Sequence, residues 1–185
     1  MAENGLDGDV IGVALDGTGY GTDGKIWGGE FLLAGYGGFD RYAHFRYFPL
    51  AGGDSAVREP WRAAVAFAHA PHDVPESKVR VLRQMIASGF NTVETSSCGR
   101  LFDAVAWIIG LRQEITFEGQ AAIELEMIAD PAEERRYTYN DLDFRPTLEA
   151  IAQDTDSPSA IAAKFHNTVA DVSRRSAAVC RPTPA

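Results

Sequence analysis

The chain has 185 residues, of which 45% are hydrophobic and 23% charged, and its formal net charge is −9. This balance is that of one ordinary globular domain, or of a large part of a bigger one, with enough apolar material for a core. So acidic a chain is a poor candidate for a broad nucleic-acid surface, which needs clustered Lys and Arg. A bound anion would need local donors, such as backbone amides, a helix terminus or a metal ion.

Nothing in the sequence predicts export or membrane insertion. The first nine residues have neither the basic region nor the apolar region of a signal peptide, and the longest apolar stretch, 104–111, is much shorter than a membrane span. Cys98 and Cys180 lie far apart and outside any CxxC motif, which favours free thiols in a reducing compartment. We therefore expect a cytoplasmic protein without a membrane or nucleic-acid partner.

Most of the 18 glycines lie in the first third of the chain, which predicts turns and β structure there. The apolar run 10–15 is typical of a buried strand that ends at Asp16, and a polar, glycine-rich loop follows as far as Lys25. Gly35, Gly37 and Gly38 punctuate the connection between the next two strands. Strands are expected over 10–15, 26–33 and 42–50, which together predict an antiparallel meander.

Helical signals dominate the rest of the sequence. Asp73 to Glu76 resembles a capping box, and Ser97 is suited to cap the helix behind it. We expect helices from Glu59-Pro60 through Ala68, from about 76 to Gly89, over 99–109, from Glu118-Gly119 to 128 and over 158–179, with 132–145 as a short strand or irregular connection. The chain then divides into a β-rich part over 1–55, a mainly helical part over 56–180 and a frayed tail over 181–185, within one domain or domain segment.

The first candidate site is the stretch from Asp16 to Gly21. Glycines let a backbone approach an oxyanion and adopt positive φ, so the successive amides of Gly17, Thr18, Gly19, Tyr20 and Gly21 are suited to an anion-binding nest. Asp16, at the end of a strand, is suited to a divalent metal that shares the phosphate oxygens. A plain hairpin turn explains the same residues about as well, because Asp and Gly favour turns.

Two helix starts offer further candidate residues. Asp103 interrupts an apolar helix, where its carboxylate has to be paired, capped or engaged by a ligand such as a ribose. Glu118 can accept from a sugar hydroxyl, and Gly119 permits close approach of a flat ligand. In each case the simpler explanation is structural: a bond from Asp103 to a nearby amide or to Arg100, and an ordinary helix start at Glu118.

No catalytic residue emerges from the pattern. Cys98 lies at a helix start, where the pKa of a thiol falls, but no base is adjacent in sequence, and we interpret this cysteine as packing. The histidines have no metal-ligand spacing and are expected to hold no metal. They are His44, His69, His72 and His166.

Six segments, in order, resemble the HypF carbamoyltransferases of nickel–iron hydrogenase maturation. They cover nearly the whole chain, and the ordered set is far more specific than any single segment. The segments are 14–21, 26–31, 52–61, 96–105, 118–126 and 165–168. The resemblance implies the domain that is similar to the tRNA threonylcarbamoyl-transfer proteins, with a partial actin/sugar-kinase-like (ASKHA) fold of the α/β or α+β class.

The resemblance also implies a reaction. A neighbouring domain makes carbamoyl-adenylate from carbamoyl phosphate and ATP, and this domain passes the carbamoyl group to the C-terminal cysteine of a partner maturation protein, on the way to the cyanide ligands of the hydrogenase. The implied roles are a divalent metal (Mg, Fe or Zn) on Asp16, phosphate on the backbone of Gly17 to Gly21 with Gly28 and Gly29, and ribose and adenosine on Asp103, Glu118 and Gly119.

Two segments of the family pattern are missing from the sequence. Family members carry a His-His-x-Ala-His metal-binding segment before the first strand, and a Ser-Gly-Gly phosphate loop with a further ligand Asp after the last helix. We therefore expect a fragment that is inactive alone and that dimerises through truncated sheet edges. Two alternatives stay open: a non-catalytic nucleotide-binding or interaction module, and an O-carbamoyltransferase of natural-product biosynthesis, although segments 96–105 and 118–126 favour the hydrogenase branch.

Overall fold

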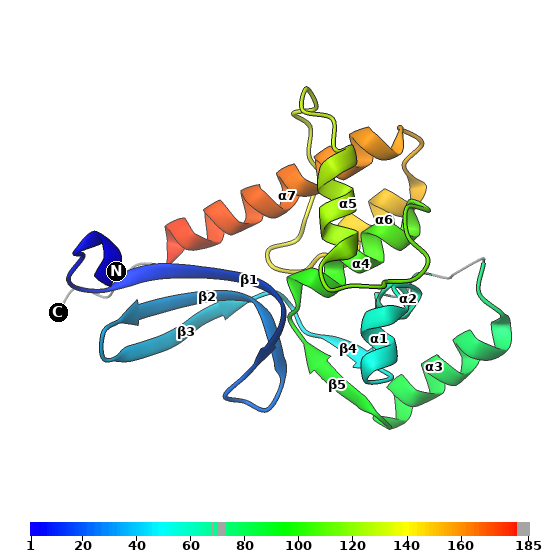
Figure 1. Cartoon of the computed structure of the whole chain (residues 1–185), viewed down its shortest axis with the longest axis horizontal. Helices are drawn as coiled ribbons and strands as arrows, with labels where there is room; N and C mark the ends of the chain where they lie inside the picture. Colours follow the sequence, from blue (N-terminus) through cyan, green and yellow to red (C-terminus); the bar gives the residue numbers. More distant parts are fainter. Residues whose placement is uncertain (68, 70–72, 181–185) are drawn as a thin grey trace.

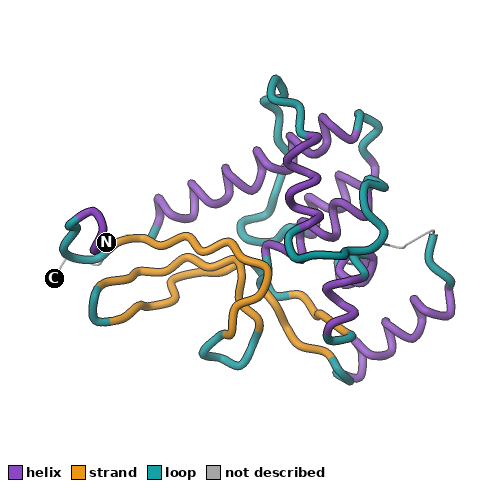
Figure 2. The backbone as a smooth tube through the Cα atoms, in the orientation of Figure 1, coloured by secondary structure: helices purple, strands orange, loops and turns teal. Residues whose placement is uncertain are grey.

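The computed structural model of the chain describes residues 1–67, 69 and 73–180. A twisted sheet with the strand order β1-β2-β5-β4, and with β3 paired to β2, carries helices at one end (Figures 1 and 2). The strands are β1 Val10–Tyr20, β2 Ile26–Gly35, β3 Gly38–His44, β4 Phe48–Ala51 and β5 Thr92–Thr95. The helices are α1 Asp54–Arg58, α2 Trp61–Ala66, α3 Glu76–Ser88, α4 Cys98–Ile108, α5 Gln120–Ile128, α6 Arg145–Gln153 and α7 Pro158–Val179, after a 3-10 turn at Ala2–Asn4.

The predicted antiparallel meander is present in β1, β2 and β3. β1 pairs with β2 from Val10↔Ala34 to Tyr20↔Ile26, and β2 pairs with β3 as far as Gly35↔Gly38. Within β1 the register shifts between Leu15 and Gly19, so residues 16–18 bulge opposite Gly28. The prediction that the first strand ends at Asp16 and gives way to a loop is therefore wrong, because the chain rejoins the ladder at Gly19.

The single strand predicted over 42–50 is two strands in the structure. β3 ends at His44, where the amide of Phe45 donates to the carbonyl of Gly29 (2.8 Å) and that of Arg46 to Leu142 (2.9 Å). Phe45 thus still bonds to β2, the Arg46 bond turns the chain away from it, and β4 pairs with β5 instead, from Phe48↔Thr95 to Ala51↔Thr92. The apolar pattern gave no sign of this break, because Phe45 and Phe48 on either side of it are both buried.

Three elements have no counterpart in the sequence-based prediction, and one of them is the short helix α1, which precedes the first predicted helix. β5, which meets β2 in parallel at Ile26↔Thr95, lies inside the part expected to be helical. It has only four residues, which is too short for an alternating pattern to be recognised. α6 follows the irregular connection 132–145 directly and carries Pro146 near its start, a position that proline tolerates.

The other helices follow their predicted ends closely. Gly89 closes α3 in the left-handed conformation (φ 70°), and the Ser97 hydroxyl caps α4 by accepting from the amide of Arg100. The capping box expected at Asp73 is wrong, because α3 begins after Pro75 and no side chain caps it. Ala68, at the end of the helix predicted from Glu59, and the tail 181–185 lie outside the described residues, as does His72.

α4 is the centre of the core. It contacts α2, α5, α6, β1 and β2, and most of its side chains are buried. Phe31 from the sheet and Phe165 from α7 are fully buried in the same cluster, and each such side chain contributes roughly 2–3 kcal/mol of hydrophobic stabilisation. α7 crosses from this cluster to reach over β1 (Figure 1). Within the described part of the chain, no helix has the length and apolar character needed to cross a bilayer.

Candidate functional site

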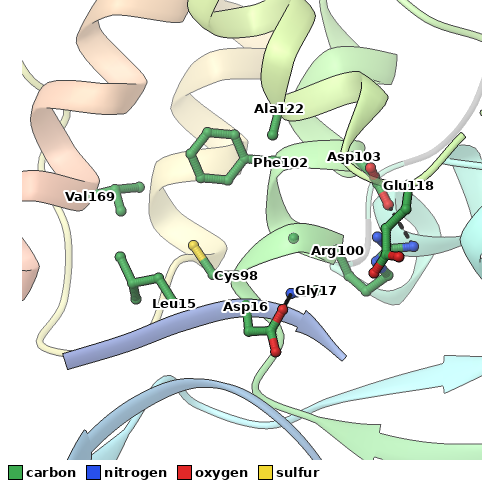
Figure 3. A pocket seen from close by; sticks show the side chains of 12 residues that line it. Leu15, Asp16, Gly17, Cys98, Arg100, Phe102, Asp103, Glu118, Ala122 and Val169 are labelled. Carbon is green, nitrogen blue, oxygen red and sulfur yellow. Dashed lines mark hydrogen bonds and ion pairs between the residues drawn. The ribbon is translucent and has the colours of Figure 1, made fainter. Parts of the chain in front are cut away.

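A cavity of about 360 Å³ opens where the bulge of β1 meets the start of α4 (Figure 3). Its volume lies at the lower end of the range for small-molecule sites. Four separate stretches of chain form its walls, and one of them, α7, contributes Val169. The lining residues are Leu15, Asp16, Gly17, Cys98, Gly99, Arg100, Phe102, Asp103, Glu118, Gly119, Ala122 and Val169.

Three of the sequence-predicted motifs meet in this cavity. Asp16 and Gly17 come from the bulge, Asp103 from α4, and Glu118 with Gly119 from the turn before α5. Gly119 is the N-cap of α5 in the left-handed conformation (φ 76°), which explains the glycine there. Residues more than 100 positions apart in sequence therefore line one cavity. The sequence analysis treated them as separate candidate sites and did not predict that they would meet.

The rest of the predicted phosphate loop has a different structure. Gly17, Gly19 and Gly21 all lack positive φ, so they do not form the expected nest. The amide of Gly17 donates to Oδ1 of Asp16 (2.6 Å), and that of Gly21 donates to the carbonyl of Lys25 (2.9 Å). Thr18 lines a second cavity beside α1, while Gly19 and Tyr20 belong to the β1–β2 ladder.

Gly28 and Gly29 are buried beside the cavity and do not line it. Both of their amides donate to Oε1 of Glu30, at 3.1 and 3.2 Å, so these donors are already occupied by a carboxylate. Glu30 also accepts from the Ser96 hydroxyl and from Nε of Arg41 (2.5 Å). These contacts outweigh the burial of the Glu30 carboxyl and hold its pKa below the ordinary value. In this structure the two glycines therefore serve packing and the Glu30 network.

Glycines also allow the bulge and α4 to meet backbone to backbone. A Cβ on Gly28 would lie 2.4 Å from the carbonyl oxygen of Asp16, and one on Gly99 would lie 2.7 Å from the Cα of Gly17. The Ser97 hydroxyl also links the bulge to α4, because it donates to the carbonyl of Gly17 (2.7 Å) while it caps α4. The position of Asp16 and Gly17 in the cavity is thus fixed from both sides.

Asp103 and Arg100 form a buried charged pair at the polar end of the cavity. Nη1 of Arg100 lies 3.0 Å from Oδ2 of Asp103, and each side chain is 4% exposed. Burial raises the pKa of Asp103 to about 6, and the neighbouring guanidinium opposes this shift only in part. Glu118 reaches the same region from an exposed turn: a Cβ on Gly17 would lie 3.9 Å from its Oε1 and 3.7 Å from Nη2 of Arg100.

Cys98 lines the cavity but is not an activated thiol. Its side chain is buried, and burial raises its pKa to about 12, so the thiolate is negligible at neutral pH. The opposite expectation, a pKa lowered by the helix start, is outweighed here by desolvation. Cys180 is also free and buried. Both observations agree with the interpretation of these cysteines as packing residues.

Among the described residues, no three His, Cys, Asp or Glu side chains come close enough to hold a metal ion. Asp16 is therefore not part of such a group, and one carboxylate does not hold a divalent ion tightly. His44 and His166 each use Nδ1 on a backbone carbonyl, of Phe45 (2.7 Å) and Ala162 (2.8 Å). The residues described here therefore do not fit a metal by themselves.

Sequence reasoning missed two kinds of cavity residue. Arg100 was considered only as a partner of Asp103, although two charges three positions apart in an apolar helix are a signal that both face one site. Leu15, Ala122 and Val169 gave no sign that they line a cavity, because an apolar residue on a cavity wall looks the same in sequence as one in the core.

The family of the chain follows from comparison with known proteins. A family model described as the second subdomain of a carbamoyltransferase Kae1-like domain matches residues 12–183. The chain belongs to this HypF carbamoyltransferase family. It is 38% identical to carbamoyltransferase HypF2 of Cupriavidus necator over 91% of its own length, and 38% identical to HypF of Synechocystis over 93%. It spans only 26% and 27% of the length of those two relatives.

Solved HypF structures have the same fold. A full-length HypF, crystallised in a phosphate- and nucleotide-bound form, matches 98% of the chain with a TM-score of 0.89 at 38% identity, while the match covers 31% of that protein. HypF of T. kodakarensis matches 96% with a TM-score of 0.82 at 33% identity, over 26% of its chain. The predicted α/β class and partial actin/sugar-kinase-like fold are thereby confirmed.

Proposed function

We propose that this chain supplies the nucleotide-holding part of a carbamoyl-transfer site in hydrogenase maturation. In this proposal a carbamoyl group passes from carbamoyl-adenylate to the C-terminal cysteine of a partner maturation protein, in the cytoplasm. The observation that carries the proposal is the single cavity shared by Asp16, Gly17, Asp103, Glu118 and Gly119. These residues come from three of the segments that resemble HypF.

The two ends of the cavity suit the two ends of a nucleoside. Leu15, Phe102 and Val169 give an apolar surface against which a purine can pack. Asp103 and Glu118, at the other end, have carboxylate oxygens that can accept from ribose hydroxyls. We assign the base to the apolar end, the ribose to the two carboxylates, and the phosphate to the neighbourhood of Gly17.

The proposed transfer needs positioning more than acid–base chemistry. The sulfur of the partner cysteine attacks the carbamoyl carbon, a C–S bond forms, and the C–O bond to the phosphate breaks. The thiol proton goes to solvent, and AMP leaves with the electron pair of the broken bond. Because the donor is already activated, holding the adenylate in a fixed place contributes most of what this chain can add. Cys98, whose pKa lies near 12, takes no part as a nucleophile.

A metal ion has no step in this proposal, since the described residues do not form a site for one. Asp16 remains the residue proposed to face a metal if ligands from elsewhere in a HypF complete the site. A second candidate function, a nucleotide-binding module without chemistry, is favoured by the same observation. In that case the chain would bind AMP and ATP but transfer nothing.

Isothermal titration of the folded chain with adenosine, AMP and ATP tests nucleotide binding. Glu118→Gln is expected to weaken nucleoside binding about tenfold, because a hydrogen bond to a charged acceptor is worth roughly 1.5 kcal/mol or more. The matched control is Glu126→Gln, an exposed glutamate of the next helix that is outside the cavity. Absence of binding at millimolar ligand, with the fold verified by circular dichroism, would remove the proposed function. Adding magnesium to wild type and to Asp16→Ala then tests the metal role.

A further inference from the structure

Arg100 is a buried cation with unused hydrogen-bonding capacity. The residue is 3% exposed, yet within the described part of the chain its Nε and Nη1 have no hydrogen-bond partner. Oδ2 of Asp103 is in the same condition, although it lies 3.0 Å from Nη1. The two groups are therefore close enough to attract each other but are not oriented to form a hydrogen bond.

Such an arrangement is costly unless a third group completes it. Buried donors of a charged side chain normally find acceptors, and a guanidinium offers five N–H groups in a rigid fork. Asp103 supplies one imperfect partner. Burial raises the pKa of its carboxyl to about 6, so the ionised form that attracts Arg100 is less favoured than in water. The free donors of Arg100 belong to a side chain that lines the cavity (Figure 3).

The surroundings of the guanidinium favour an anion over another protein group. Nη2 of Arg100 lies 3.7 Å from where a Cβ of Gly17 would be, so the missing side chain leaves the backbone of the bulge open beside the fork. The carboxylates that share this end of the cavity, Asp103 and Glu118, are suited to the hydroxyl donors of a ribose, which leaves the guanidinium for an anionic group. Arg100 is the cationic residue among those that line the cavity.

We propose that Arg100 is the phosphoryl-binding side chain of this cavity. Its guanidinium takes the anionic oxygens of a nucleoside 5′-phosphate, while Asp103 and Glu118 take the ribose hydroxyls. Arginine suits this role because its planar fork binds two oxygens of one phosphoryl group at once. The inference rests on the proposed nucleotide function, which it deepens by naming the residue that distinguishes a nucleotide from a nucleoside.

The test is the ratio of AMP affinity to adenosine affinity, measured by titration calorimetry. Wild type is expected to prefer AMP, and Arg100→Gln is expected to lower that preference at least tenfold while adenosine affinity changes less than threefold. Arg100→Lys keeps the charge but loses the planar guanidinium, and its preference for AMP is expected to lie between those of wild type and Arg100→Gln. Arg112→Gln is the matched control, since Arg112 pairs with Glu124 and does not line the cavity.

A purely structural role for Arg100 makes a different prediction. It would weaken adenosine and AMP binding together and leave their ratio unchanged, which would overturn the inference. If Arg100→Gln does not fold, the comparison is made between Asp103→Asn and Asp103→Asn with Arg100→Gln, where the buried pair has become neutral. If these two variants have the same ratio of AMP affinity to adenosine affinity, the inference is likewise overturned.

Two further outcomes separate the proposals. Wild type that binds neither adenosine nor AMP defeats the proposed function and this inference together, whereas wild type that binds both with an Arg100-independent ratio defeats the inference alone. Carbamoyl phosphate is the second probe. If it competes with AMP in wild type but not in Arg100→Gln, the Arg100 subsite binds phosphoryl groups in general. Lack of such competition, with the ratio still dependent on Arg100, restricts it to the phosphate of the nucleotide.

Discussion

Replacing Gly28 with alanine tests whether the bulge of β1 is held in place by backbone contact. An added Cβ would lie 2.4 Å from the carbonyl oxygen of Asp16 and 3.0 Å from the Cα of Ser97. Both neighbours are backbone atoms, so neither can rotate away. The bulge has to retreat by at least about 0.6 Å to restore a 3.0 Å contact.

The matched control is Gly12→Ala in the neighbouring strand. There the added Cβ would lie 3.7 Å from the Cβ of Leu32, an ordinary contact. Both substitutions reduce the backbone freedom of the unfolded chain by the same amount, so their difference isolates the clash. Overpacking of this kind costs roughly 1–3 kcal/mol, which for a chain of this size lowers the melting temperature by roughly 3 to 9 °C.

Two assays read the outcome. Urea denaturation gives the free energy of unfolding of each variant, and titration with AMP gives the affinity of the cavity. Gly28→Ala is expected to be less stable than Gly12→Ala and to bind AMP about tenfold more weakly, because the bulge that lines the cavity has moved. Equal stability and equal affinity in the two variants would refute the idea that the glycine fixes the bulge.

The remaining predictions concern two carboxylates. Glu30→Gln is expected to lower the free energy of unfolding in urea by about 3 kcal/mol, because it leaves Arg41 half-paired in a buried network. Its control, Glu94→Gln, removes an exposed ion pair and is expected to change that free energy by less than about 1 kcal/mol. Equal losses in the two variants would contradict this reasoning. Asp103, whose pKa burial raises from an ordinary value near 4 to about 6, binds its proton more tightly in the folded state, so stability gains as pH falls from about 6 to 4. Asp103→Asn is therefore expected to exceed wild type by up to about 3 kcal/mol at pH 8 and to match it near pH 4, and a pH-independent difference would contradict the assignment.

The sequence predicted the elements whose signals are local. Ser97 and Gly89 mark helix ends through capping chemistry, and both do so in the structure. β5 and the break after β3 escaped prediction because they depend on which strand each segment pairs with, and pairing is a tertiary choice. The loop predicted after Asp16 failed for the same reason, since the chain resumes pairing with β2 after the bulge.

Prediction of the candidate site was limited in a related way. Asp16, Asp103 and Glu118 were each singled out by their chemistry, and the fold brings them to one cavity. Gly28 and Gly29 were expected to face phosphate, but the sequence could not reveal that the carboxylate of Glu30 binds their amides. A glycine needed for close packing and a glycine needed by a ligand have the same signature.

The walls of the cavity extend along the chain from Leu15 to Val169, so almost the whole sequence has to fold before the cavity exists. A ligand that binds there opposes any opening that separates the four stretches of chain that line the cavity, which include β1, α4 and α7. At a ligand concentration of one hundred times Kd, the linkage adds about 2.7 kcal/mol to the free energy of unfolding. A thermal-shift screen of nucleotides is for this reason a direct readout of the site, and amide exchange slowed by ligand should be spread over α4, β1 and α7 together.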